Sequence, residues 1–197
     1  IDVTSVLTSN NWTDGDYTVA NVPVTTDTLE GDSGVIGKYG GWSLVVIYED
    51  LSAPLKSVSI YDGWQKITGS SSSNSATITV DNFYTPTSGD INSTVSVFVA
   101  EGDAERDGAY FKTGATSLGD SADAFSSLIV STGIRTPSLI NNQGIDIQTY
   151  QLGTTGYNVL ANSQSSIDFS LTTGGVIDYF YPSMLSFSTE VYHPKMC

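Results

Sequence analysis

Four acidic side chains stand at alternate positions in the sequence EGDAERDG. They are Glu101, Asp103, Glu105 and Asp107, and only Arg106 offsets their charge. Calcium takes about six to eight oxygen ligands, which loops dense in carboxylates and backbone carbonyls supply. The spacing is not that of an EF-hand, which requires D-x-D-x-D-G and a terminal glutamate. We therefore expect one calcium ion held by these four carboxylates, with a solvated acidic loop as the alternative.

Three aromatic side chains are candidates for binding a ligand. Trp12, Trp64 and Tyr84 all stand among turn-forming residues. Their flat apolar faces suit stacking on sugar rings or on apolar peptide side chains when they are exposed. The alternative is packing in the core, which we expect most strongly for Trp42 because it begins an apolar run. A glycan or a peptide is the ligand class that these residues predict.

Residues for catalysis are sparse. His193 is the one histidine and lies close to the last residue given, and the sequence has no G-x-S-x-G or H-E-x-x-H motif. A glycosidase needs only two carboxylates, and pairs such as Glu49 with Asp50 or Glu101 with Asp103 meet that requirement in type. Carboxylates in loops are weak evidence, so we predict no catalytic residue and a protein that is not an enzyme.

The charge balance narrows the choice of partners. Seven basic and 21 acidic residues give a formal net charge of −14. Such a field repels the phosphates of nucleic acids and anionic lipid head groups. Cys197 is the only cysteine, so no disulfide closes within the sequence given. No stretch of about 18 successive apolar residues is present to insert into a membrane. We expect an extracellular domain whose polar surface consists mainly of Ser, Thr, Asn and Gln.

The elements that position these residues are predicted to be strands. The passage from Gly40 to Gly63 is the longest apolar-rich one. Within it, Trp42–Tyr48 is apolar on both faces, as in a central strand, and Lys56–Tyr61 alternates like a half-buried strand. We expect both to be central strands, joined by a loop.

Other apolar runs raise the number of strands to ten or so, which requires two packed sheets. The sequence therefore predicts an all-β fold, a two-sheet antiparallel sandwich of jelly-roll-like form, with long loops and little helix. The range 1–197 is interpreted as a single β-sandwich domain cut from a longer protein. The segment Glu101–Asp123 is predicted to be a loop, and Ala122–Val130 suits either a short helix or a strand. The remaining predicted strands are Asp2–Leu7, Tyr17–Val24, Trp64–Ile67, Ala76–Val80, Ser93–Ala100, Ile145–Tyr150, Ile167–Thr172 and Met184–Tyr192.

Four sequence blocks together carry a resemblance. They are GGWSLVVIYED, PLKSVSIYDG, VFVAEGD and DYFYPSMLSFSTEVYHP, in that order between Asp16 and Pro194. This pattern resembles an uncharacterised β-rich domain of large, adhesin-like bacterial cell-surface proteins. The resemblance implies an exported chain attached to the cell surface beside repeated extracellular β modules, and it implies no catalytic residue.

Composition and resemblance together lead to two functional expectations. The first is a non-catalytic structural or adhesive module of an exported bacterial surface protein, whose partners are other domains of that same protein. The alternative is a calcium-dependent module that binds a glycan or a peptide.

Overall fold

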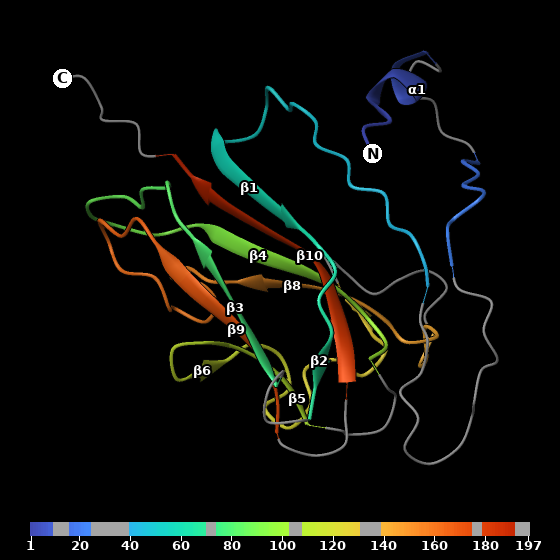
Figure 1. Cartoon of the computed structure of the whole chain (residues 1–197). Coiled ribbons are helices and arrows are strands. Elements are labelled where there is room, and N and C mark those ends of the chain that lie inside the picture. Colours follow the sequence, from blue (N-terminus) through green and yellow to red (C-terminus); the bar gives the residue numbers. More distant parts are fainter. Residues whose placement is uncertain are drawn as a thin grey trace.

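The computed structural model describes residues 1–9, 16–24, 40–69, 74–102, 108–130, 139–174 and 179–191. Within these ranges the chain is all-β apart from one short helix, as the sequence predicts (Figure 1). The elements are α1 (Thr4–Ser9), β1 (Lys56–Asp62), β2 (Ile67–Thr68), β3 (Ser75–Val80), β4 (Ser93–Ala100), β5 (Ala109–Thr113), β6 (Thr116–Ser117), β7 (Ile129–Val130), β8 (Ile145–Gln151), β9 (Ile167–Thr173) and β10 (Tyr179–Glu190).

The strands form two sheets. One has the order β1-β10-β4-β8-β7, with β2 also paired to β10, and the other has the order β3-β9-β5-β6. The antiparallel pairs are nested in the sequence: β1 with β10, β3 with β9, β4 with β8, and β5 with β6. Successive pairs alternate between the two sheets. This nesting is the arrangement of a jelly roll, in which one long hairpin wraps around a shared core.

The core lies between the sheets and follows the alternation of the strands. Val95, Val97 and Val99 of β4 are fully buried, as the alternation of Ser93–Ala100 predicts. Phe111 of β5 packs against Phe169 of β9 with ring centroids 5.6 Å apart. Phe111 also contacts rings on β8 and on the segment before β7. These aromatic contacts join the two sheets.

The strands β1 and β2 run along the same side of β10 and are separated by a bulge at residues 63–66. The backbone N–H of Gly63 donates to the carbonyl of Ser183 over 3.0 Å, which keeps the bulge attached to β10. The register of β10 shifts between Pro182 and Met184 at the same level. Bulges in both strands re-aim the side chains that they carry. The bulge at residues 63–66, together with the register shift in β10, therefore determines where Trp64 lies.

The prediction of two central strands between Gly40 and Gly63 is wrong. Residues 40–50 contain neither helix nor strand, and Trp42 is 51% exposed instead of buried. β1 is a terminal strand of its sheet, not a central one. The central positions belong to β10 and β4, which bury long alternating apolar faces. The apolar content of Trp42–Tyr48 therefore did not determine its place in the fold.

Four other predicted elements need correction. The predicted strand Trp64–Ile67 is a strand only from Ile67, where β2 begins, because residues 63–66 form the bulge. Asp2–Leu7 was expected to be a strand, but the Oδ1 atom of Asp2 accepts the N–H of Thr4 over 2.8 Å at the start of α1. Such a cap favours a helix. The predicted strand Tyr17–Val24 is exposed and irregular from residue 17 to 24. The expected loop Glu101–Asp123 contains β5 and β6. Alternate side chains of β5, among them Phe111, are buried in the core, which stabilises a strand there.

Candidate ligand-binding site

An aromatic cluster lies where the bulge after β1 meets β10. The indole of Trp64 stacks on the ring of Tyr181, with centroids 5.2 Å apart and planes 17° from parallel. Tyr179 meets Tyr181 edge to face at 6.4 Å. Phe180, between these tyrosines, is buried in the core, so Tyr179 and Tyr181 point to the outer face of the sheet. We call Trp64, Tyr179 and Tyr181 the Trp64 platform.

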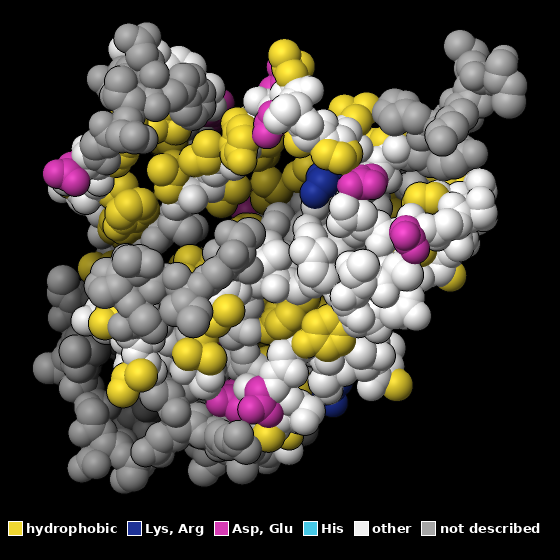
Figure 2. Space-filling view, turned by 180° about the vertical axis from the view of Figure 1, so that it is seen from behind, with side chains coloured by type: hydrophobic (Ala, Val, Ile, Leu, Met, Phe, Trp, Pro, Cys, Tyr) yellow, Lys and Arg dark blue, Asp and Glu magenta, His cyan; other side chains and the backbone are white. Residues whose placement is uncertain are grey.

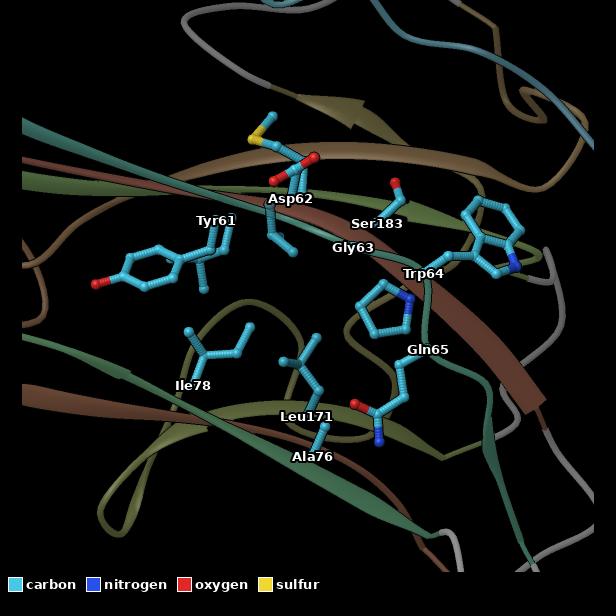
Figure 3. Close-up of a pocket in the computed structure, with 13 residues that line it drawn as sticks. Tyr61, Asp62, Gly63, Trp64, Gln65, Ala76, Ile78, Leu171 and Ser183 are labelled. Atoms are coloured by element: carbon cyan, nitrogen blue, oxygen red, sulfur yellow. The ribbon is translucent and has the colours of Figure 1, made fainter. Parts of the chain in front are cut away.

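The Trp64 platform combines an open aromatic face with polar groups. Trp64 is 52% exposed, whereas Tyr181 beneath it is buried. Asp62 and Ser183 point to the same side of the sheet as Trp64 (Figure 3). The Nζ atom of Lys66 lies 5.8 Å from the centre of the Tyr179 ring. This part of the outer face therefore carries an apolar ring face, a carboxylate acceptor, a hydroxyl and a cation.

A pocket of about 370 Å³ opens beside the platform, between the edges of the two sheets. Its floor consists of the buried side chains of Val97, Leu171 and Leu185. The indole of Trp64 lies at the mouth and points away from Leu171 on the floor (Figure 3). Because apolar side chains line it, this pocket suits apolar groups. The other lining residues are Tyr61, Asp62, Gly63, Gln65, Ala76, Ile78, Pro182, Ser183 and Met184.

A second pocket of about 370 Å³ lies at the opposite end of β1. It is lined by Ser57, Asn82, Phe83, Tyr84 and Val191, and Tyr84 is 54% exposed. The two pockets follow the open side of the sandwich between β1 and the segment from β3 to Tyr84. We call them together the edge groove.

The structure therefore separates two of the predicted ligand-binding residues. Trp64 and Tyr84 lie near opposite ends of β1, about 23 Å apart at the usual strand rise of about 3.3 Å per residue. Instead of Tyr84, Trp64 has Tyr181 and Tyr179 as neighbours, which sequence reasoning missed. Trp12, the third predicted residue, lies outside the described residues.

Of the four predicted calcium ligands, only Glu101 falls within the described residues. Asp103, Glu105 and Asp107 lie outside them. Glu101 directly follows β4, is half-buried and has a left-handed backbone with φ of 68°. The part of the chain that the structure describes contains no cluster of three or more His, Cys, Asp or Glu side chains placed to hold a metal. Calcium binding stays a prediction from the sequence.

Calcium should raise the melting temperature if these four carboxylates bind it. The expected gain is about 2.7 kcal/mol of stability at a hundredfold excess over the dissociation constant, because only the folded chain holds the ligands together. Thermal melts with calcium and with chelator measure the difference. Sodium at equal ionic strength is the control, since it screens repulsion without coordinating. Identical curves with calcium and chelator would contradict the prediction.

A buried polar network lies on the inner face of β8. The carboxylate of Asp146 is completely buried and accepts three hydrogen bonds. Its donors are the backbone N–H groups of Ser127 at 3.1 Å and Leu128 at 2.7 Å, and the Nε2 atom of Gln148 at 3.1 Å. Gln148 in turn accepts from the hydroxyl of Tyr150. The network ties β8 to the segment before β7.

Burial raises the pKa of Asp146 from its ordinary value of 3.8 to about 6. Loss of water around the carboxylate is the largest cause, and the nearby charge of Asp123 adds to it, while the three hydrogen bonds act in the opposite direction. The alternation of Ile145 and Ile147 predicts this strand. It does not indicate that Asp146, Gln148 and Tyr150 face the core and that the isoleucines do not.

Gly102→Ala is expected to destabilise the fold, because Gly102 packs directly on this network. A Cβ atom there would lie 2.0 Å from Oδ2 of Asp146 and 2.9 Å from the carbonyl oxygen of Phe125. The structure must shift to relieve this overlap, at a cost of about 1–3 kcal/mol. Urea unfolding measures the change. Gly63→Ala is the matched control, because nothing lies within 4 Å of its added Cβ; equal effects of both substitutions would contradict the packing.

Comparisons with protein-family models, with curated proteins and with solved structures each found no match to this chain. No helix among the described residues has both the length and the apolar character needed to cross a membrane. The geometry of the Trp64 platform and the edge groove therefore supplies the functional argument.

Proposed function

We propose that this chain is a non-catalytic adhesive module of an exported bacterial cell-surface protein, and that the Trp64 platform binds a glycan. The observation that carries the proposal is the half-exposed indole of Trp64, held flat on Tyr181 beside Asp62 and Ser183. An apolar ring face next to hydrogen-bonding groups matches the two kinds of surface that a sugar ring presents.

The rigidity of the platform favours binding. Tyr181 is buried under the indole, and β10 holds Tyr181 in register opposite Ala100 of β4. The ring of Trp64 therefore has its orientation before a ligand arrives, which lowers the entropy lost on binding. The net charge of −14 repels acidic polymers, so a neutral or basic glycan is the favoured class.

The carboxylates near the platform support a binding role rather than hydrolysis. Asp62 is the one carboxylate among the described residues that line the pocket beside Trp64, and Glu101, whose charge acts on Tyr181, follows β4 on the opposite side of β10 from Asp62. Glycoside hydrolysis in most families uses two carboxylates, about 5–9.5 Å apart, on either side of the scissile bond. The surface location is proposed from the acidic, serine- and threonine-rich composition and from the resemblance to adhesin-like proteins.

Trp64→Ala is expected to weaken glycan binding about ten- to thirtyfold. Loss of one stacked aromatic contact corresponds to about 1.4–2 kcal/mol. A glycan array probed with the whole chain identifies the ligand, and titration calorimetry then measures the affinities. Tyr84→Ala is the control, because Tyr84 is equally exposed but lies at the other end of β1. The absence of any glycan binding would contradict the proposal and leave a purely structural module. Equal loss in both variants would contradict the assignment of the site to the Trp64 platform.

A further inference from the structure

The longest run of exposed apolar side chains in the described part of the chain is separated from the start of β1 by residues 49–55. Residues 42–48, which we call the apolar segment, belong to no helix or strand. Their six large hydrophobic side chains are between 43% and 78% exposed. Figure 2 shows hydrophobic side chains as a yellow band across the upper left, with a hollow below it, where the chain before β1 runs. Such a run of β-branched and aromatic residues strongly favours a strand.

The next strand along the chain after the apolar segment has an unpaired edge. β1 pairs with β10 on one side, and no strand of the described residues pairs with its other side. Proteins commonly protect such an edge with proline, charge or a covering segment. Between its terminal residues Lys56 and Asp62, β1 has no charge and no proline, and Val58 is 51% exposed. This edge is therefore open to a further strand.

The chain between the two elements already reverses its direction. The N–H of Ala53 donates to the carbonyl of Asp50 over 3.1 Å, and the Oδ1 atom of Asp50 accepts the N–H of Ser52 over 2.9 Å. This turn sends the apolar segment back along β1 (Figure 1). We propose that the free edge of β1 is a strand-acceptor site, and that the apolar segment of the same chain binds there as an antiparallel strand.

The inner face of β1 borders a space that the added strand would fill. Ser57 and Ser59 stand opposite Thr189 and Phe187 of β10, both of which are buried. Residues opposite each other in an antiparallel pair point to the same face, so both serines face the interior. Their small side chains leave the edge groove open above an apolar floor. Larger apolar side chains from a neighbouring strand fill that space.

A connection of residues 49–55 allows the following register. If Tyr48 pairs with Lys56 across residues 49–55, Val46 stands opposite Val58 and Leu44 opposite Ile60, all four on the outer face. Val45 and Ile47 then stand opposite Ser59 and Ser57 and point into the edge groove. The groove then covers the inward side chains of the apolar segment, and its outward side chains stand beside apolar side chains of β1. Both faces of the segment therefore have apolar contacts, which suits its lack of a polar face.

The occupant is the segment of the same chain rather than that of a second copy. A connection of residues 49–55 holds the two partners together at an effective concentration of about millimolar. A second copy at micromolar concentration competes poorly with that. The strand addition uses the edge and inner face of β1, and in the register given above its end at Trp42 stands opposite Asp62, beside the Trp64 platform. It leaves the stacking of Trp64 on Tyr181 as it is.

Paired cysteines test the proposal directly. In a chain with Cys197→Ser, Val46→Cys and Val58→Cys place two thiols on directly opposite residues, whose Cα atoms lie about 4.5–5.5 Å apart in an antiparallel pair. Oxidation should give a cross-linked monomer at least about tenfold faster than in the control pair Ile47→Cys and Val58→Cys, whose side chains point to opposite faces. Equal rates, or cross-linked dimers, would overturn the proposal.

Hydrogen exchange on the unaltered chain decides the matter if the cysteine variants do not fold. Amide protons of residues 42–48 that bond to the edge of β1 should exchange at least about tenfold more slowly than those of an unstructured peptide of the same sequence. Alternate amides should be protected, because only every second N–H of the added strand faces β1. Exchange at the peptide rate throughout the segment would overturn the proposal.

Discussion

Replacing Phe111 by alanine is expected to lower the free energy of unfolding by about 3–5 kcal/mol. The ring is fully buried and contacts Phe125, Tyr150 and Phe169, so its removal leaves a cavity between the two sheets. Urea unfolding followed by tryptophan fluorescence measures the change. This is the largest effect that we expect from a single substitution.

Tyr84→Ala is the matched control for Phe111→Ala. It removes an aromatic ring of similar size from an exposed position, and surface substitutions usually change stability by less than about 0.5 kcal/mol. A loss below about 1 kcal/mol for Phe111→Ala would contradict its place at the centre of the sandwich. So would equal effects of the two substitutions.

Raising the pH from about 4 to about 6 is expected to cost about 2 kcal/mol of stability through Asp146 alone. Burial raises the pKa of this carboxyl from 3.8 to about 6, so the folded chain holds a proton there that the unfolded chain has released. The unfolded state therefore binds fewer protons in this window, and stability falls as the pH rises. The contribution is complete below pH 3.8 and lost above about pH 6.

Comparison with Asp146→Asn isolates this effect from the other carboxylates. The variant lacks the titrating group but keeps an oxygen for the N–H of Leu128. Its amide nitrogen would face the N–H of Ser127, so we expect lower stability overall but no pH dependence from this site. The difference in unfolding free energy between the two proteins, measured by urea unfolding from pH 4 to pH 7, should fall by about 2–2.5 kcal/mol. A constant difference would show that Asp146 does not titrate in this range.

The sequence predicts those strands whose own side chains alternate between core and surface. Val95, Val97 and Val99 in β4, and Ile167, Phe169 and Leu171 in β9, indicate both the strand and its buried face, and the structure confirms them. Prediction from the sequence fails for Trp42–Tyr48, because an apolar run does not indicate which part of the chain packs against it. The sequence predicts the strand β8 but not its buried face, where hydrogen bonds of Asp146 and Gln148 make polar side chains stable inside the core.

The candidate site is predictable in part. Trp64 stands among turn residues and is exposed, which stacking on a ligand requires and which the alternative of core packing does not fit. Its contact with Tyr181 joins residues 64 and 181, and only the pairing of β1 and β2 with β10 brings them together. The same register places Tyr84 at the far end of β1. Long-range register, which no local pattern encodes, therefore determines the composition of the Trp64 platform.

The most direct test of glycan binding at the Trp64 platform is an NMR titration of the three tryptophan indole N–H signals. The chain has three tryptophans, and the spectrum of Trp64→Ala assigns the signal of Trp64. Addition of a glycan selected on the array should shift that signal more than those of Trp12 and Trp42, because a stacked sugar alters most strongly the environment of the indole that it contacts. A shift of the Trp12 or Trp42 signal with Trp64 unchanged would contradict the proposed site.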